Sequence, residues 1–384
     1  MAAEVGGKLL IIKRLAPEKA HAWVGGPETT RRNALKTRRF WRASGGLLIE
    51  YLLPELCVLR GFVVNYQRMK ALFFERRKAR VIDAPEPRAR AGYAKVKVLV
   101  SGICNTDLEL LRGYYRFSGI PGHEFVGRVV SPGSPLAGRR VVGEINLACG
   151  RCSWCAAGLG RHCPRRAVLG IVKHPGAHAE YLTLPEGNLV PVPDSVPDEE
   201  AVFAEPLAAA CEILEQLGSV EGRKTAVLGA GKLGLLVAQV LAQAGADVSV
   251  FGWRPEKLRV ARRIGLEARP APARTPRAQF DLVVEATGTP AGLPRAIQMT
   301  KPRGTVVMKS TFHGLARFDA APLVVNEITV VGSRCGRFAP AMALLACRAV
   351  QVRPLISAEY PLSRASAALR HATRPGSVKV LLRP

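Results

Sequence analysis

The sequence lacks long apolar runs and is poor in acidic residues. Its most apolar stretch, residues 47–64, is interrupted by Glu50, Pro54, Glu55 and Arg60, whereas a transmembrane helix needs roughly 18 apolar residues in a row. We therefore expect no membrane span and no membrane partner. A secretory signal is also missing, so the nine cysteines indicate a reducing, cytoplasmic setting. The 384 residues, 48% of them hydrophobic, suffice for two globular domains.

The shortage of acidic residues gives the chain a formal net charge of +26. Such a charge attracts polyanions, including nucleic acid, through a salt-sensitive term that is independent of sequence. The arginines, however, are scattered through every region and do not alternate with aromatic residues. We interpret the charge as a basic solvated surface, which also suits an anionic dinucleotide or a phosphorylated substrate. A zinc-ribbon protein that binds nucleic acid is the remote alternative, and we expect no specific nucleic-acid partner.

Four cysteines lie within fifteen residues, spaced C-x2-C-x2-C-x7-C: Cys149, Cys152, Cys155 and Cys163. Two-residue gaps let neighbouring thiolates converge on one point, as a tetrahedral zinc with four sulfur ligands requires. Disulfides between thiols this close in sequence would be strained. We predict a structural zinc site, with an iron–sulfur cluster or metal-free thiols as the alternatives.

Residues 1–68 differ from the rest, because they mix short apolar runs with basic clusters and show no sustained period. A strand-like pattern begins at Met69, where we expect the natural protein to start. We interpret residues 1–68 as an atypical N-terminal extension that is not native. The alternatives are an organelle-targeting arm and a loosely packed appendage.

From about residue 222 the chain alternates between apolar strand patterns and helical patterns, which predicts a parallel sheet covered by helices. The Pro/Ala/Arg stretch 268–277 is predicted to be a loop. The predicted strands are 224–228, 247–251, 281–285, 304–308 and 328–331, and the first two predicted helices are 234–244 and 254–264.

A G-x-G-x-x-G motif follows the first of these strands and opens a helix; its residues are Gly229, Gly231, Lys232, Leu233 and Gly234. In this context the three glycines permit the turn, the close approach of a pyrophosphate and the packing of helix on strand. We predict a dinucleotide site here, although a glycine turn without a ligand is the alternative.

The end of the second strand bears on the choice of dinucleotide. An NAD site places Asp or Glu about 20 residues after the glycine motif, where it binds the ribose hydroxyls. Gly252 occupies that position and Arg254 follows, so a carboxylate is missing and a guanidinium is near. The pattern favours NADP over NAD, because a 2′-phosphate is repelled by a carboxylate and attracted by arginine. If Arg254 is only a surface residue, either cofactor binds.

A second metal centre is suggested by donors far apart in the chain: Cys104, His123 and Glu205. A catalytic zinc takes about three protein ligands and keeps one position open for water or substrate. Each residue taken alone is more often structural. Their combination with the cysteine cluster and the glycine motif favours a catalytic metal site.

Together these motifs resemble the zinc-dependent medium-chain dehydrogenase/reductase superfamily, in particular its alcohol and polyol dehydrogenases. The resemblance covers residues 69–384. It implies an α/β protein in which a GroES-like, mainly β catalytic domain, residues 69–208 and 345–384, surrounds a Rossmann cofactor-binding domain, residues 209–344. The motifs that carry it are residues 102–107, 122–127, 149–163, 205–208 and 229–234.

By the same resemblance, Cys104 and His123 are expected to bind the catalytic zinc. Glu205 resembles the acidic ligand of the polyol-type branch, where alcohol dehydrogenases often have cysteine. Glu124 resembles the adjacent carboxylate that binds the metal or exchanges with water. The chain would then hold two zinc ions, one catalytic and one structural.

The remaining site residues follow from the resemblance too. Asp107 resembles the acid that orients the metal site, and Thr106 the hydroxyl that takes the substrate proton. Glu109 departs from the family, because many members have a histidine there that passes the proton to solvent. The implied reaction is oxidation of a polyol, sugar or simple alcohol by NAD(P), and the alternative is an NADPH-directed aldehyde or ketone reductase. A homo-oligomer, dimer or tetramer, is expected.

Overall fold

The computed structural model describes residues 58–59, 62–63, 67–311 and 315–384. Contacts divide the chain into Met1–Asn65 and Tyr66–Pro384. Within the first unit the described residues form a short antiparallel pair, β1 (Val58–Leu59) and β2 (Phe62–Val63). The predicted extension, residues 1–68, lies almost entirely outside the described residues.

In the second unit, seven strands of the described chain form a sheet ordered β12-β7-β6-β5-β20-β19, with β11 also paired to β5. The central strand β5 is long enough to pair with β6 along one edge and with β11 and β20 along the other. Since β20 closes the chain, residues near the C-terminus return to this sheet. The strands are β5 (Tyr93–Ile103), β6 (Glu124–Val129), β7 (Arg140–Gly143), β11 (Tyr181–Pro185), β12 (Leu189–Pro191), β19 (Ile356–Pro361) and β20 (Lys379–Arg383).

Smaller elements flank this sheet. A hairpin, β3 (Arg68–Glu75) and β4 (Lys78–Pro85), precedes β5, and helix α1 (Asn105–Arg112) follows it. Strand β8 (Asn146–Leu147) pairs with β9 (Ala167–Leu169), which pairs with β10 (Lys173–His174); the predicted cysteine cluster lies between β8 and β9.

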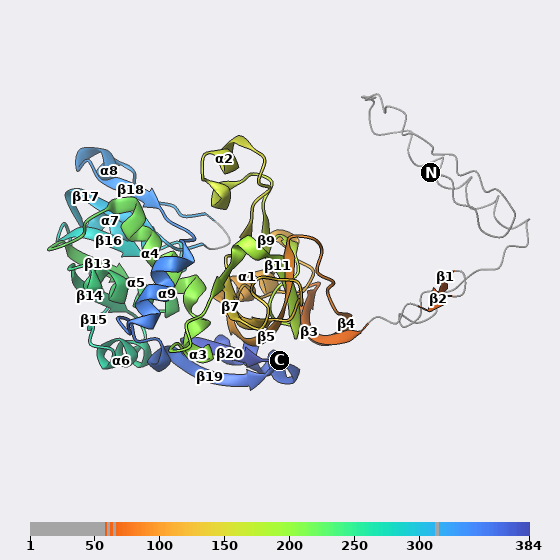
Figure 1. Ribbon diagram of the computed structural model, residues 1–384. Helices are drawn as coiled ribbons and strands as arrows, with labels where there is room; N and C mark the ends of the chain where they lie inside the picture. The colour runs from red at the N-terminus through yellow and green to blue at the C-terminus, as the bar shows by residue number, and fades with distance from the viewer. Residues whose placement is uncertain (1–57, 60–61, 64–66, 312–314) are drawn as a thin grey trace, which may run out of the picture. The chain divides into compact units, whose positions relative to one another are not determined.

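A parallel sheet of six strands, all in the described part of the chain, has the order β15-β14-β13-β16-β17-β18 (Figure 1). Strands β14 and β15 lie on one side of β13, and β16, β17 and β18 lie on the other, so the strand order reverses between β13 and β16. In open parallel sheets, ligands bind at such a reversal, beyond the carboxyl ends of the strands. The strands are β13 (Lys224–Leu228), β14 (Asp247–Gly252), β15 (Glu267–Pro270), β16 (Phe280–Glu285), β17 (Thr300–Met308) and β18 (Thr329–Gly332).

Alternate residues of these strands are buried against different helices, as the period of two requires. One face packs with helices α4 (Ala204–Leu217), α5 (Lys232–Gln243) and α6 (Pro255–Arg263), for example through Val227 and Val250. The other face packs with helix α7 (Gly292–Met299) through Leu228 and Phe251. The predicted helix-covered parallel sheet is therefore confirmed. The helices that follow α1 are α2 (Ser153–Ala156), α3 (Asp198–Ala201), α4 (Ala204–Leu217), α5 (Lys232–Gln243), α6 (Pro255–Arg263), α7 (Gly292–Met299), α8 (Ala321–Val325), α9 (Phe338–Ala346) and α10 (Ala365–Ala372).

The predicted loop 268–277 is wrong at its start. Residues 267–270 form β15, the edge strand beside β14, and Ala268 is buried. The alternation of buried and exposed positions there is too short to show in a stretch rich in proline and arginine, and pairing with β14 decides the conformation.

Helix α4 packs against both β-sheets. One continuous hydrophobic core contains its buried residues together with Val100 of β5, Val126 of β6 and Val227 of β13. The helix therefore fixes whatever its first turn carries relative to both β-sheets. Among the described residues, none of the helices combines the length and the apolar character that crossing a bilayer requires.

Candidate catalytic metal centre and cofactor site

Helix α1 starts at the end of β5 and places two predicted site residues. Cys104 is its N-cap, and the Cys104 N–H group donates a hydrogen bond to Asp107 Oδ2 at 2.7 Å. This capping contact fixes both side chains relative to the end of β5. The Cys104 thiol lies 3.7 Å from Thr106 Oγ1, so the predicted proton acceptor is beside the predicted ligand.

The structure brings together three of the four donors predicted for the catalytic metal. Donor atoms of Cys104, His123 and Glu124 all lie within 4.8 Å of one another. Pairing of β6 with β5 accounts for this, because it sets Glu124 opposite Gly102, two residues before the cysteine. His123 and Glu124 are buried and Cys104 is partly buried.

Glu124 makes a fully buried ion pair with Lys379, a residue that the sequence did not single out. Glu124 on β6 and Lys379 on β20 lie on strands that flank β5, and they meet over Gly102. A Cβ atom on Gly102 would lie 2.5 Å from Glu124 Oε2, so glycine is what leaves room for the pair. The other oxygen, Glu124 Oε1, is buried and has no hydrogen-bond partner.

Asp107 lies between two buried histidines. Its carboxylate is 3.7 Å from His123 Nδ1 and 3.5 Å from His178 Nε2, and a hydrogen bond joins His178 Nδ1 to Ser101 Oγ at 2.9 Å. Burial opposes ionisation, but the two histidines and the Cys104 N–H group together hold the pKa of Asp107 well below its ordinary range. An ionised Asp107 can orient the His123 ring, which is the role predicted for it.

Glu205 lies in the first turn of α4 and outside the tight group of donors. Its surroundings still link it to the centre. Burial raises the pKa of Glu205, and the charge of Glu124 raises it further while that of His123 lowers it. Its role as a ligand stays a prediction.

Glu109 stands where the resemblance implies a histidine that passes the proton to solvent. It is mostly buried and forms an ion pair with Arg112 on the next turn of α1. The Glu109 carboxylate is therefore engaged by a cation on its own helix.

The glycine motif has the form of a phosphate-binding loop. Gly229 has a φ of 116°, and a Cβ atom on Gly234 would lie 1.8 Å from the Gly229 carbonyl oxygen. Nothing lies within 4 Å of the Cβ position of Gly231, which is the N-cap of α5. This open helix N-terminus can accept an anion through its free N–H groups.

Basic side chains lie around this loop. Burial lowers the pKa of Lys257, and the positive charges of Lys232 and Arg254 lower it further. Lys232 Nζ also donates to the Ile103 carbonyl oxygen at 3.1 Å, which links the loop to the residue before Cys104.

The four cysteines of the predicted structural site converge. Their Sγ atoms lie within 4.8 Å of one another, with separations of 3.4 Å (Cys152–Cys155), 3.7 Å (Cys152–Cys163) and 4.0 Å (Cys149–Cys155). A tetrahedral zinc with Zn–S bonds of about 2.3 Å sets its sulfurs about 3.8 Å apart. These distances are far longer than a disulfide bond of about 2 Å.

Sequence reasoning missed several residues near these sites. His178 and Lys379 are single polar residues between apolar neighbours, and this pattern is the sequence signal that could have marked them; the structure shows that both are buried. Glu285, at the end of β16, accepts hydrogen bonds from the Thr287 N–H group and from Ser310 Oγ, at the carboxyl edge where a dinucleotide binds.

Two family models match the chain. Residues 90–194 match the alcohol dehydrogenase GroES-like domain, and residues 233–347 match the zinc-binding dehydrogenase domain. The second match covers the glycine motif from Leu233 onward and the strands after it. The expected fold class, a GroES-like domain with a Rossmann domain, is confirmed.

Curated relatives and solved structures agree with these models. A sorbitol dehydrogenase of Halalkalibacterium halodurans is 29% identical over 79% of this chain and 95% of its own. A D-altritol 5-dehydrogenase of Agrobacterium fabrum is 32% identical over 76% and 92%. A protein described as a zinc-binding dehydrogenase of Sinorhizobium meliloti, bound to NADP, has a TM-score of 0.76 and 28% identity over 83% and 100%. The chain belongs to the zinc-dependent medium-chain dehydrogenase/reductase superfamily and is an oxidoreductase that interconverts an alcohol and its carbonyl with NAD(P).

Proposed function

We propose that this enzyme oxidises a polyol or sugar alcohol, and reduces the carbonyl product, at a zinc centre held by Cys104, His123 and either Glu124 or Glu205. The observation that carries the proposal is the group of thiolate, imidazole and carboxylate donors within 4.8 Å of one another. The sorbitol and altritol dehydrogenases among its relatives support the polyol class.

The residues present fit a catalytic zinc ion. Lys379 pairs with Glu124 Oε2, whereas Glu124 Oε1 is buried without a hydrogen-bond partner and so offers a free oxygen donor that a metal ion could use. One sulfur, one nitrogen and one oxygen donor match the ligands that zinc takes in catalytic sites with an open position. When bound, zinc supplies Lewis-acid chemistry, and the nicotinamide accepts or returns a hydride.

The protein's own residues would position the reactants and move the proton. Thr106 Oγ1, beside the Cys104 thiol, is placed to take the proton of the substrate hydroxyl. Asp107 would orient His123. Lys379 would hold one oxygen of Glu124 and leave the other directed at the metal.

We further propose that NADP is preferred over NAD. A side chain at Gly252 would meet Ala230 Cβ at 2.8 Å and Leu258 at 3.0 Å, so the acid that selects NAD has no space there. Arg254 and Lys257 supply positive charge nearby, which suits a 2′-phosphate. Removing either side chain should raise the KM for NADP by about tenfold and leave that for NAD nearly unchanged.

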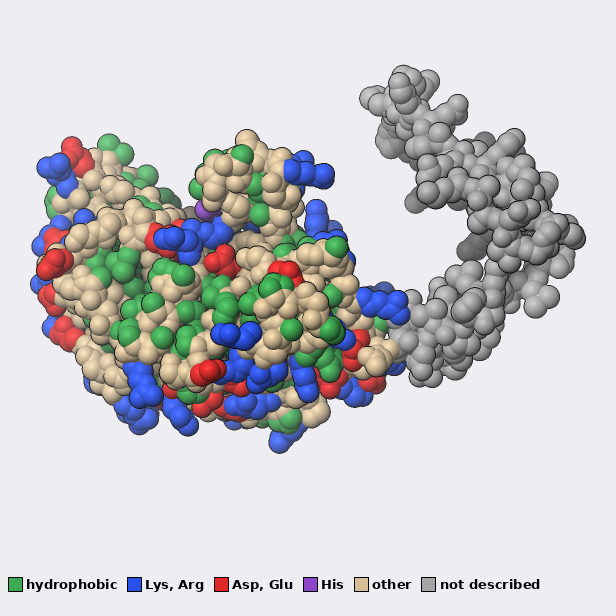
Figure 2. All heavy atoms as spheres, viewed as in Figure 1, with side chains coloured by type: hydrophobic (Ala, Val, Ile, Leu, Met, Phe, Trp, Pro, Cys, Tyr) green, Lys and Arg blue, Asp and Glu red, His purple; other side chains and the backbone are tan. Residues whose placement is uncertain are grey.

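The four-cysteine group would hold the structural zinc. The convergence of the four Sγ atoms within 4.8 Å of one another is what supports this site. On the face shown in Figure 2, Lys and Arg side chains are interspersed with acidic and apolar ones, which supports a solvated surface rather than a nucleic-acid site. We also propose that the enzyme is a homo-oligomer and that it works in the reducing environment of the cytoplasm. For the domains we propose the boundaries given in the sequence analysis.

A substrate screen with the Cys104→Ala variant as control tests the proposal. Polyols, sugars and simple alcohols are offered with NAD and NADP in parallel, and zinc is measured on the same samples. We expect turnover of a polyol by the wild type, no turnover by Cys104→Ala, and dinucleotide binding in both. Full activity in a Cys104→Ala protein that lacks the catalytic metal would contradict the zinc centre.

A further inference from the structure

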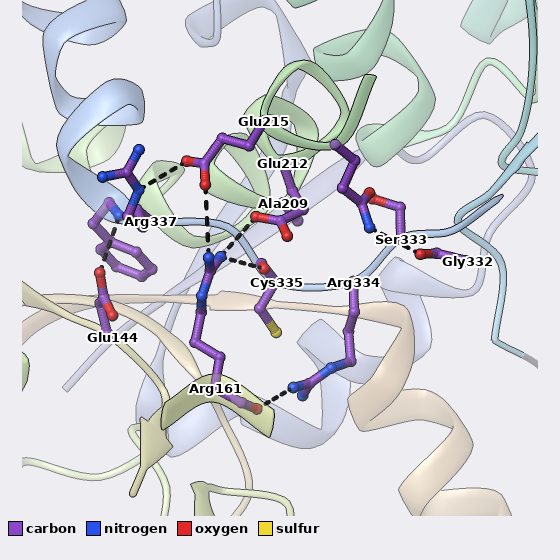
Figure 3. Close-up of polar contacts among 12 residues, drawn as sticks. Glu144, Arg161, Ala209, Glu212, Glu215, Gly332, Ser333, Arg334, Cys335 and Arg337 are labelled. Carbon is purple, nitrogen blue, oxygen red and sulfur yellow. Dashed lines mark hydrogen bonds and ion pairs between the residues drawn. The ribbon is translucent and has the colours of Figure 1, made fainter. Parts of the chain in front are cut away.

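Arg161 lies in the cysteine lobe, residues 149–163, but its guanidinium contacts residues outside the lobe (Figure 3). Nη1 donates to Glu212 Oε2 at 2.7 Å and to the Cys335 carbonyl oxygen at 2.8 Å, and Nη2 lies 3.6 Å from Glu215 Oε2. One side chain therefore joins the lobe to helix α4 and to the segment that follows β18.

Of the two α4 carboxylates that Arg161 contacts, Glu212 lies on the same face of the helix as the candidate metal ligand Glu205. Glu205 and Glu212 are seven positions apart, which is two helical turns. Glu212 is buried, so its carboxylate depends on Arg161 for compensation. The ion pair thereby adds a polar contact to the apolar packing of α4, on the side of the helix that carries Glu205.

The segment after β18, residues 333–337, is held to α4 as well. Lys309 Nζ donates to the Ala209 carbonyl oxygen at 2.7 Å, to Ser333 Oγ at 3.0 Å and to the Arg334 carbonyl oxygen at 2.9 Å. A Cβ atom on Gly336 would lie 1.9 Å from the Ala208 carbonyl oxygen, so the two backbones are in direct contact.

This segment also contacts the cysteine lobe. A second arginine returns to the lobe, since Arg334 Nη2 donates to the Arg161 carbonyl oxygen at 2.7 Å. The lobe and the segment are thus tied by both the side chain and the backbone of Arg161.

We infer that Arg161 is a positioning residue through which the cysteine lobe controls the geometry of the catalytic centre in the same chain. Arg161 lies between two lobe cysteines, Cys155 and Cys163, so binding of a metal by the lobe fixes its backbone. It then holds α4, with Glu205, and residues 333–337 in the arrangement that the reaction needs. This inference rests on the proposed catalytic and structural zinc sites.

The test compares Arg161→Met with Arg151→Met, which removes an exposed arginine from the same lobe and matches the change in charge. Hydrogen–deuterium exchange is measured over residues 204–217 and 332–337, in the same zinc-loaded state of each protein. Chelator competition gives the affinity of the catalytic metal, and steady-state kinetics gives kcat and KM. Arg161→Lys, which keeps one cation without the planar fork, serves as the conservative variant.

We expect Arg161→Met to exchange faster in both segments, to bind the catalytic metal about tenfold more weakly and to lower kcat more than it raises KM, while the lobe keeps its zinc. Arg151→Met should match the wild type, and Arg161→Lys should fall between. The inference is overturned if faster exchange is confined to residues 149–163, or if the two methionine variants behave alike. A wild type that turns over no alcohol would instead contradict the proposed function.

Discussion

Replacing Lys379 with methionine should strongly lower the free energy of unfolding. Lys379 is fully buried, so we expect the change to act through the stability of the fold and not through contact with substrate. Its ammonium is paired with Glu124 in a site where both side chains are 0% exposed. Methionine keeps most of the apolar stem, so the change removes charge with little loss of volume. What remains is a buried carboxylate without its cation.

The size of the effect follows from that burial. Removing one partner of a buried ion pair costs about 3–5 kcal/mol, because the other charge is left without compensation. For a protein of this size we expect Tm to fall by roughly 10 °C. Converting the partner as well, in Lys379→Met with Glu124→Gln, removes the orphaned charge and should recover about 2 kcal/mol relative to the sum of the single variants.

Urea unfolding of the wild type, both single variants and the double variant, compared at equal zinc content, measures this coupling. Lys70→Met is the matched control, because Lys70 pairs with Asp83 where the two side chains are 58% and 51% exposed. An exposed pair contributes less than about 1 kcal/mol. If Lys379→Met destabilises the protein no more than Lys70→Met does, or if the double variant shows no recovery, the assignment of a buried Glu124–Lys379 pair is wrong.

Three further predictions concern other parts of the molecule. Gly234→Ala should abolish dinucleotide binding in a fluorescence titration, because its methyl group would collide with the Gly229 carbonyl oxygen; ordinary binding would contradict the loop geometry. Cys152→Ser should lower zinc content by one ion per chain and reduce Tm, and unchanged zinc would refute the structural site. Burial lowers the pKa of Lys309 from 10.5 to about 8, so the unfolded chain binds its proton between these pH values and the folded chain does not. Stability should therefore rise between pH 8 and 10.5 by about 3 kcal/mol more in the wild type than in Lys309→Met, and parallel pH curves would refute this.

Sequence patterns correctly predicted those features of the fold that depend on residues close together in the chain. Strand β13 has the predicted bounds, 224–228, because a short apolar run before a glycine motif has few other conformations available. The cysteine spacing predicted converging thiols for a similar reason, since only a few residues separate them.

Long-range pairing accounts for most of what was missed. Lys379 meets Glu124 only because β20 and β6 flank the same strand at Gly102, and nothing in the residues near Lys379 encodes that register. The roles of His178 and Arg161 likewise depend on contacts with residues far along the chain, Asp107 and Glu212 respectively. The edge strand β15 was missed because its four residues alternate too briefly to outweigh the neighbouring prolines.

The position of zinc in a crystal of the purified enzyme tests the central claim most directly. Anomalous X-ray scattering collected on either side of the zinc absorption edge locates the metal without reference to the protein chain. We expect two peaks per chain, one bound by Cys104 and His123 and one among the four cysteines of the lobe. A fully zinc-loaded, active enzyme with no anomalous peak within bonding distance of Cys104 and His123 would contradict the account.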